Sequence, residues 1–304
     1  MPNVKLKNYL HLHFIVFIWG FTAILGELIS IDALPLVWYR MLMASGFIYL
    51  FIRLRKISLI ISRKLLVTLC VAGTIIALHW ITFFAAIKVS NVSITLAVLS
   101  TGAFFTSILE PIFYKRKLIW YEVLFGLMVI AGLYIIFNVE GDYFLGILYA
   151  ICSAFLSSVF SLINGKIAQQ YNSSMISFYE LLSGVGFVTL YLVAISFFGN
   201  QNEGFSASFF QLSSTDWIYL IILASVCTAY AFIGSVQVMK YLSPYTVMLT
   251  VNLEPVYGII LAFLIFGDSE KMNPGFYYGA LIIIGTVVLN GIFKNFKKIK
   301  RQSS

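Results

Sequence analysis

The sequence predicts an all-α polytopic membrane protein with ten transmembrane helices, arranged as two inverted five-helix repeats. The first observation is composition: of 304 residues, 61% are hydrophobic and only 11% are charged, which is typical of a chain that crosses a membrane many times. The second is that the apolar residues form ten runs, each near the about 20 residues that a helix needs to span a bilayer core. The third is that short sequence patterns recur in the same order in the two halves.

The apolar runs give the element order. We expect spans at residues 9–29, 33–52, 65–87, 91–113, 119–138, 144–165, 175–198, 217–239, 244–266 and 276–293. The first run is too long for a signal peptide and lacks a small-residue cleavage pattern, so we interpret it as an uncleaved span. The three cysteines lie in separate apolar runs, so neither a disulfide framework nor a metal site is expected.

Lysine and arginine predict the orientation. Lys88 and Lys271 fall on one side of the predicted membrane and Arg40 lies within a span, whereas the rest of the 20 basic residues fall on the other side. Because cytoplasmic loops are rich in basic residues, we expect both termini in the cytoplasm and the protein in the cell (cytoplasmic or inner) membrane. The basic residues sit in loops and tails between apolar spans, so the net charge of +8 does not indicate a nucleic-acid partner.

Three weak matches indicate an internal repeat. Lys88 matches Lys240, the pair Gly126 and Gly132 matches Gly279 and Gly285, and Trp38-Tyr39-Arg40 with Gly46 matches Phe178-Tyr179-Glu180 with Gly186. Each half then holds five spans, an odd number, so the second half lies upside down relative to the first. We expect the first repeat at 9–138, the second at 144–293 and a basic cytoplasmic tail at 294–304. Inverted repeats around a midplane site are typical of alternating-access carriers.

The ninth predicted span carries the strongest candidate site. Asn252, Glu254 and Pro255 lie near its middle, where a carboxylate costs roughly 2.5–3.5 kcal/mol on insertion scales. Pro255 removes a backbone donor and frees the carbonyl of Val251, which needs a partner. One interpretation is a substrate or proton site at the midplane. The other is a kinked helix whose Glu254 bonds a neighbouring helix.

Further candidates for substrate binding lie on other spans. His79 can titrate near neutral pH and Trp80 can stack on a cation or an aromatic ligand, so the pair forms either part of the substrate wall or an interfacial anchor. Polar residues at helical spacing also line the eighth and ninth spans, among them Tyr230 and Tyr257. The predicted substrate-binding set is Glu254, Asn252, Tyr257, His79, Trp80 and Tyr230.

Two charged pairs flank hairpin turns at about equal depth. Glu27 and Arg40 flank the first outer turn, and Lys166 and Glu180 flank an inner turn in the second half. We hypothesise that each pair is an ion pair that latches one face, with only one closed at a time. The alternative is that each pair only staples its own hairpin, and exposed pairs contribute about 0–1 kcal/mol.

A family resemblance rests on motifs spread along the chain. They are Trp19-Gly20, Tyr39-Arg40, His79-Trp80, Lys88, Leu253-Glu254-Pro255 and Phe266-Gly267-Asp268. On these residues the chain resembles the ten-span carriers of the EamA family, in the drug/metabolite transporter superfamily, with two EamA-like halves. The resemblance implies secondary transport, usually export, of amino acids or other small metabolites. Family members often carry a proline in the middle of the fourth span. Ser100-Thr101-Gly102 stands there here, so we expect the first half to be less kinked than the second.

The motifs separate the function classes. The chain has no His-Glu-x-x-His pair, no Gly-x-Ser-x-Gly elbow and no phosphate loop, so neither an enzyme nor a cofactor is expected. Our first hypothesis is a secondary carrier that exports small metabolites such as amino acids, with a small-molecule substrate and the lipid bilayer as partners. A proton-coupled multidrug exporter is the second hypothesis. A non-transporting membrane scaffold is the third, and the repeat and the midplane carboxylate disfavour it. The solute and any coupling to protons stay open.

Overall fold

All regular secondary structure in the described residues is helical, and turns join the helices. The computed structural model describes residues 2–115, 120–198, 204–242, 247, 250–251 and 253–302. The long helices are α1 (Pro2–Leu28), α2 (Ala33–Leu54), α3 (Arg63–Val89), α6 (Trp120–Val139), α7 (Phe144–Ile167), α8 (Ser173–Phe198) and α13 (Pro274–Gln302). The shorter helices are α4 (Val92–Leu99), α5 (Gly102–Tyr114), α9 (Ser214–Ala224), α10 (Ala231–Val238) and α12 (Glu254–Phe266).

Seven helical stretches are long and apolar enough to cross a membrane. They are Leu6–Leu28, Ala33–Leu54, Arg63–Val89, Val92–Tyr114, Gly141–Ile167, Ser173–Phe198 and Ser214–Val238. Two shorter apolar helical stretches, Leu124–Val139 and Pro274–Thr286, lie within α6 and α13. These helices confirm the predicted class of an all-α polytopic integral membrane protein. α13 also continues as helix to Gln302, through most of the segment that we predicted as a separate basic tail.

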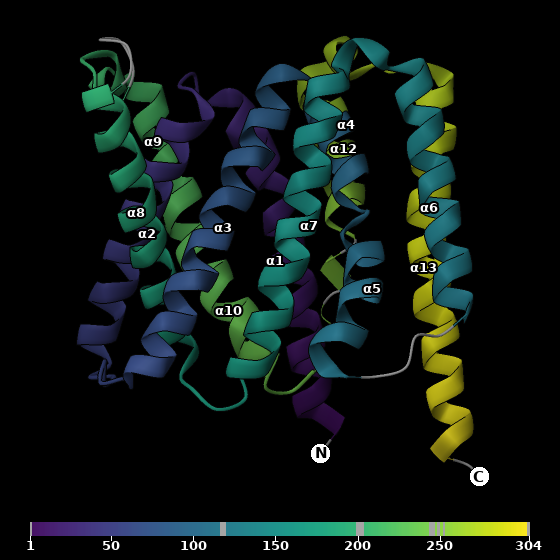
Figure 1. The fold of residues 1–304 in the computed structure, drawn as a ribbon, viewed down its shortest axis with the longest axis horizontal. Helices are drawn as coiled ribbons and strands as arrows, with labels where there is room; N and C mark the ends of the chain where they lie inside the picture. Colours follow the sequence, from purple (N-terminus) through teal and green to yellow (C-terminus); the bar gives the residue numbers. More distant parts are fainter. Residues whose placement is uncertain are drawn as a thin grey trace.

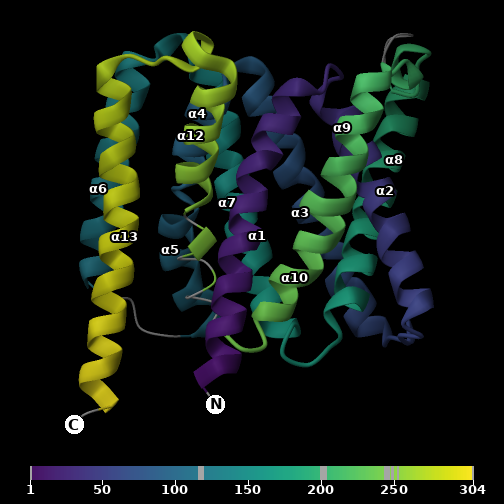
Figure 2. The same cartoon turned by 180° about the vertical axis from the view of Figure 1, so that it is seen from behind.

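The helices run between two opposite faces of the molecule. Figures 1 and 2 show both termini at one of these faces, and the connection from α6 to α7 at the other. α6 packs on α13 at one edge of the molecule, whereas α2 and α8 pack together toward the other edge. α1 and α7 lie between these edges, where α1 packs on α12 and α10, and α7 packs on α3, α4 and α5.

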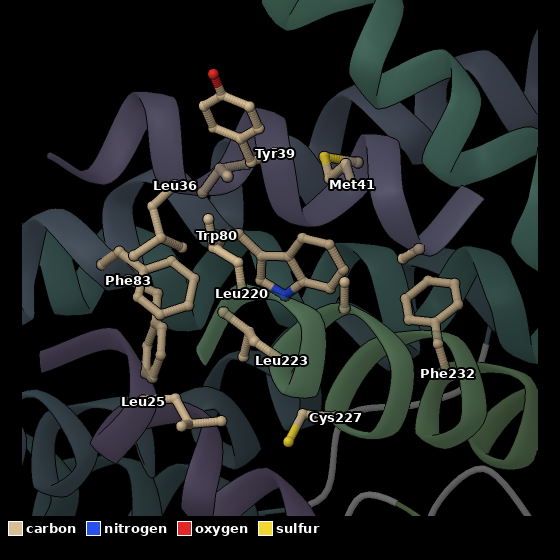
Figure 3. Packing of buried hydrophobic residues seen from close by; sticks show 14 of the residues in the cluster. Leu25, Leu36, Tyr39, Met41, Trp80, Phe83, Leu220, Leu223, Cys227 and Phe232 are labelled. Atoms are coloured by element: carbon tan, nitrogen blue, oxygen red, sulfur yellow. The ribbon is translucent and has the colours of Figure 1, made fainter. Parts of the chain in front are cut away.

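Apolar side chains from both halves of the sequence fill the space between the helices. Figure 3 shows part of the largest cluster, in which Leu36 of α2 and Trp80 of α3 gather with Leu220 and Leu223 of α9 and Phe232 of α10. Large apolar side chains also cover the outside of the molecule; Leu190 and Leu264, for example, are 72% and 73% exposed. A soluble protein rarely exposes that much apolar surface, so the outward faces suit contact with lipid.

Glycines allow the closest helix contacts. A Cβ atom at Gly73 of α3 would lie 2.2 Å from the backbone oxygen of Glu180 on α8, so only glycine permits this approach. Gly132 of α6 and Gly279 of α13 face each other in the same way, since a Cβ at either would lie within 2.9 Å of the other's carbonyl oxygen. Small residues at helix interfaces let backbones pack closely inside membranes.

The fourth predicted span is broken in its middle, although no proline stands there. α4 ends at Leu99 and α5 begins at Gly102. The hydroxyls of Ser100 and Thr101 donate to the carbonyls of Ala97 and Val98, three residues back, at 2.5 and 2.7 Å. Serine and threonine side chains that bond to the preceding turn compete with the helix and bend it. These hydroxyls therefore break the helix without a proline.

The second half contains two further irregular points. A π-helical turn, η3 (Ser225–Tyr230), separates α9 from α10, and such turns occur often at functional sites. α12 begins at Glu254 with Pro255 in its first turn, a position where a proline's missing N–H would lack a helical partner in any case. Pro255 therefore lies in the first turn of α12. Val247, Thr250 and Val251 before it are also helical, so the interpretation of a kinked span stays open.

Candidate functional site

One cavity is lined by polar side chains from both halves of the chain. It encloses about 1020 Å³ of space, which includes its opening to solvent. Its walls come from α1, α2, α3, α7, α10, α12 and the break between α4 and α5. The lining residues are Trp19, Thr22, Arg40, Ile76, His79, Trp80, Phe83, Leu99, Ser100, Gly102, Ser157, Phe160, Ser161, Phe232, Ser235, Met239, Val247, Val251, Glu254 and Pro255.

Arg40 supplies the positive charge of the cavity. Only 2% of its surface is exposed, and its guanidinium carbon lies 3.8 Å from the centroid of the Trp80 ring. Its Nε donates to the hydroxyl of Thr228 in η3 at 2.7 Å. That hydroxyl in turn donates to the carbonyl of Leu223, five residues back, so the π-helical turn presents an oxygen to the arginine. The stacking and the hydrogen bond together stabilise a cation that is costly to bury.

Glu254 supplies the negative charge and lies where we predicted a binding carboxylate. It is the first residue of α12, where the positive end of the helix dipole stabilises an anion. Its carboxylate and the guanidinium of Arg40 belong to residues that line the same cavity. The side chain keeps intermediate exposure although protein surrounds it, because its accessible surface faces the cavity. The cavity therefore holds one acid and one base from different halves of the chain.

His79 and Trp80 both line the cavity. The His79 Nδ1 lies 2.9 Å from the carbonyl oxygen and 2.8 Å from the hydroxyl oxygen of Ser153 on α7. The Ser153 hydroxyl also approaches the His79 carbonyl oxygen at 3.1 Å. This double contact orients the imidazole, while the indole of Trp80 supports the arginine.

Several polar lining residues escaped the sequence analysis. Thr22 of α1 and Ser157 and Ser161 of α7 face the cavity, and none of them was among the predicted site residues. The spacing of four between Ser157 and Ser161 places both on one helix face, which was the available signal. Phe83, Phe160 and Phe232 complete an aromatic wall that hydrophobicity alone cannot distinguish from ordinary core.

Two predicted binding residues, Tyr230 and Tyr257, are not among the residues that line the cavity. Tyr230 is 44% exposed and its hydroxyl lies 2.9 Å from the His11 Nε2. Tyr257 packs its ring edge-on against Phe17, with 5.6 Å between the centroids, and its backbone contacts α1 at Gly20. Both tyrosines are one helix face away from the cavity. Asn252 lies outside the described residues.

The two predicted latch pairs are wrong. Arg40 points into the cavity, while Glu27 lies exposed at the end of α1, where Lys88 donates to the backbone carbonyls of Glu27 and Ile29. In the second half, Lys166 donates to the carbonyl of Phe113 at 2.8 Å.

Glu180, the other member of that second pair, accepts a hydrogen bond from Asn164. Equal depth along neighbouring helices did not produce either contact, because the rotation of each helix about its axis turns the partners to different sides.

The arrangement suits recognition of a small zwitterion. A guanidinium can bind a carboxylate and a carboxylate can bind an ammonium group, and here both face one cavity. Five hydroxyls and an imidazole can hydrogen-bond the rest of the solute, and the aromatic wall excludes water. The hydroxyls belong to Thr22, Ser100, Ser157, Ser161 and Ser235.

A bundle of membrane helices that breaks beside a polar cavity has the construction of a transporter, in which irregular backbone lines the solute path. The comparisons with known proteins agree. The chain belongs to the EamA-like transporter family, whose model matches residues 7–138 and 144–292. This match confirms the family resemblance found in the sequence, and the protein is therefore a membrane transporter.

One curated protein and one solved structure are also similar to this chain. The uncharacterized transporter YxxF of Bacillus subtilis (strain 168) is 23% identical over 253 residues, which cover 80% of this chain and 77% of the relative. One solved crystal structure matches with a TM-score of 0.66 at 15% identity, over 93% of this chain and 97% of that chain. Likeness at such low identity shows that the two chains share a fold.

Proposed function

We propose that the protein is a secondary carrier that exports a small polar metabolite, such as an amino acid, by alternating access. The observation that carries this proposal is the cavity in which Arg40 and Glu254 face the same space. One residue comes from the first half of the chain and the other from the second. A solute bound by both therefore links the two halves, as a carrier requires.

The packing pattern supports two inverted five-helix repeats, at 9–138 and 144–293, and thus ten spans. If α1 corresponds to α7 and α3 to the segment from α9 to α10, the packing of α3 on α7 has its counterpart in the packing of α1 on η3 and α10. Likewise, α1 on α12 corresponds to α7 on α4 and α5. α1 starts at the face that carries the termini and α7 starts at the opposite face, so equivalent helices run in opposite directions. An even number of spans with termini in the cytoplasm follows from this arrangement and from the distribution of basic residues.

Two carboxylates join the halves on the face opposite the termini. Asp216 accepts from the backbone N–H and hydroxyl of Ser30 at 2.7 and 2.8 Å. Glu270 accepts from the backbone N–H groups of Val92 and Ser93 at 3.0 and 2.8 Å. Charge-assisted bonds of this kind are about twice as strong as neutral ones. They support a state that is closed on this face, and Asp216 and Glu270 replace the latch residues that the sequence suggested.

The test compares the medium around cells with and without the protein, followed by uptake into everted membrane vesicles. We expect one or a few amino acids or related zwitterions to accumulate outside only when the protein is present. The same solutes should enter everted vesicles, and Glu254→Gln should lower that uptake. Unchanged extracellular metabolites together with unchanged vesicle uptake would contradict the carrier and favour a scaffold.

A multidrug exporter is the second candidate, and the aromatic wall of Trp80, Phe83, Phe160 and Phe232 is the observation that favours it. An aromatic cavity with one carboxylate can bind a lipophilic cation. However, such a cation gains nothing from Arg40, whose charge repels it. Protection of cells against lipophilic cations, with no change in extracellular amino acids, would select this alternative.

A further inference from the structure

A second buried polar group lies outside the cavity, between α7 and α8. It consists of Glu180, Asn164 and Ser177, none of which has any exposed surface. The Asn164 Nδ2 donates to the Glu180 Oε1 at 2.9 Å. Three atoms of this group are buried without a hydrogen-bond partner, namely Glu180 Oε2, Asn164 Oδ1 and Ser177 Oγ. Buried polar atoms are normally paired, so this cluster calls for a physical explanation.

The two unpartnered atoms of Glu180 and Asn164 are complementary. If Glu180 carries a proton on Oε2, that hydroxyl can donate to the Asn164 Oδ1 while the amide N–H donates to Oε1. The result is a closed ring of two hydrogen bonds between a carboxylic acid and an amide, with both orphan oxygens satisfied. Rotation of the amide by 180° produces the same ring, so the argument does not depend on how its oxygen and nitrogen are assigned.

A charged Glu180 would lack compensation at this place. The hydrogen bond from Asn164 is its one recorded electrostatic partner among the described residues. The ionisable groups on the helices packed against α8 are engaged elsewhere or lie at helix ends. Lys166 of α7 bonds to Phe113, His79 of α3 to Ser153 and Arg40 of α2 to Thr228. Cys70 of α3 accepts a hydrogen bond from Ser183. The side chains of Arg53, Arg63 and Lys64 are exposed. α10 carries no ionisable residue.

The close packing of α8 seals the group from water. Gly73 of α3 brings that helix against the Glu180 backbone, and a Cβ at Gly184, one turn further along α8, would lie 2.0 Å from the Met41 Cε. An unpaired carboxylate in such surroundings is strongly disfavoured. Protonation removes the charge and lets the unpartnered oxygens of Glu180 and Asn164 pair with each other in one step.

We propose that Glu180 and Asn164 form a buried proton-binding site that couples proton movement to transport. The coupling half of this inference rests on the proposed carrier function. In the described state the proton stays on Oε2. When α7 and α8 separate during the transport cycle, water reaches the pair and the O–H bond breaks. The proton passes to water, and the carboxylate that remains is hydrated. The site lies outside the solute cavity, so solute and proton bind at separate places.

Infrared spectroscopy of the purified protein tests the site without any solute. Near neutral pH the wild type should show the carbonyl band of a buried carboxylic acid, and Glu180→Gln should remove that band. Glu254→Gln is the matched control, because it removes a carboxyl that faces the solute cavity and should leave the Glu180 band in place. Asn164→Leu should shift the band to higher frequency, since the carbonyl loses its donor. A spectrum that is the same in wild type and folded E180Q, or a band that N164L leaves unmoved, would overturn the proposal.

Everted vesicles test the coupling, with an equimolar mixture of the common amino acids as the probe. An imposed pH gradient should stimulate uptake in the wild type and in Glu27→Gln, an exposed control, but not in Glu180→Gln. Persistent stimulation in E180Q would overturn the coupling. If neither the wild type nor E27Q takes up any amino acid, the proposed function fails, while the infrared result still decides whether the proton site exists.

Discussion

Glu254 and Glu180 are both carboxyl groups inside helical membrane segments, yet their surroundings differ in every respect. Glu254 begins a helix and faces a cavity that Arg40 also lines. Glu180 lies in the middle of a helix with no exposed surface, and its partner is a neutral amide. The first site shares its cavity with a base and lies at the positive end of a helix dipole, and both stabilise a carboxylate. The second has none of these.

A membrane protein can accommodate a buried acid in two ways. The cost of a buried charge can be offset by an opposite charge and water, or avoided by protonation within a hydrogen-bonded pair. A site of the first kind is open to a solute. A site of the second kind excludes solutes and can hold only a proton. Both residues are glutamates, so residue type alone does not distinguish the two kinds of site. Substitutions around each site can distinguish them.

The largest effect is expected from Glu254→Gln. A hydrogen bond to a charged group contributes about 1.5–3 kcal/mol, and about 1.4 kcal/mol corresponds to a tenfold change in affinity. We therefore expect solute affinity to fall about 10- to 100-fold, measured as the concentration dependence of uptake into everted vesicles. Glu27→Gln, at an exposed position of α1, should have no such effect. If the two variants behave alike, Glu254 has no special role in binding.

Gly73→Ala should disrupt the close packing of α3 against α8 around Glu180. Its Cβ would lie 2.2 Å from the Glu180 backbone oxygen, and overpacking of this kind typically costs about 1–3 kcal/mol. Denaturant unfolding of the purified protein measures this loss. Gly186→Ala is the control on α8, since a Cβ there meets nothing within 4 Å and alanine favours a helix by up to about 1 kcal/mol. Equal stabilities of the two variants would show that α3 and α8 are less tightly packed than described.

Arg40→Lys should weaken the contacts that hold the cation in the cavity. Lysine cannot stack a planar guanidinium on Trp80, nor place an Nε–H toward Thr228. The expected loss is about 1–2 kcal/mol in the free energy of unfolding, with reduced uptake of zwitterions. The same exchange at Arg53, which is exposed on α2, should change neither quantity. A fully active and fully stable R40K variant would argue against the assigned contacts.

The smallest effect is expected at the break between α4 and α5, which forms part of the cavity wall near Glu254. The hydroxyl of Ser158 donates to the carbonyl of Gly102 at 2.7 Å and thereby satisfies a carbonyl that the break exposes. Ser158→Ala should lower the free energy of unfolding by about 0.5–1.5 kcal/mol. The neighbouring Ser157→Ala removes a hydroxyl that faces the cavity instead, so it should affect uptake more than stability. The reverse pattern would contradict the assignment of the two serines.

Much of the fold was predictable, because insertion into a bilayer depends on local properties of the chain. Runs of apolar residues of the right length predict spans whatever the rest of the molecule does. Among the described residues, seven helical stretches of sufficient length confirm seven of them. The break at Ser100 and Thr101 was not predicted. Proline is a strong signal for a broken helix, whereas hydroxyls that bond back to the preceding turn are a weak one. At this break Ser158, from another helix, donates to the exposed carbonyl of Gly102.

The candidate site was predictable in part. Glu254, His79 and Trp80 stood out because ionisable and amphipathic residues are costly inside a membrane and so need a protein or water partner. Tyr230 and Tyr257 have the same polar character, but a small difference in angle around the helix axis turns them away from the cavity. The sequence gives no direct signal of that angle for a helix that is apolar on most sides.

Local properties of the chain were enough to predict the class of protein, the position of most spans and which acids lie inside the membrane. Only the tertiary structure decided that Arg40 faces Glu254 rather than Glu27, and that Glu180 meets Asn164 rather than Lys166. The physical reason is that hydrophobic burial is a property of each segment, whereas a contact between side chains depends on the depth and rotation of two segments far apart in the chain. Those quantities are set by the packing of all the helices together.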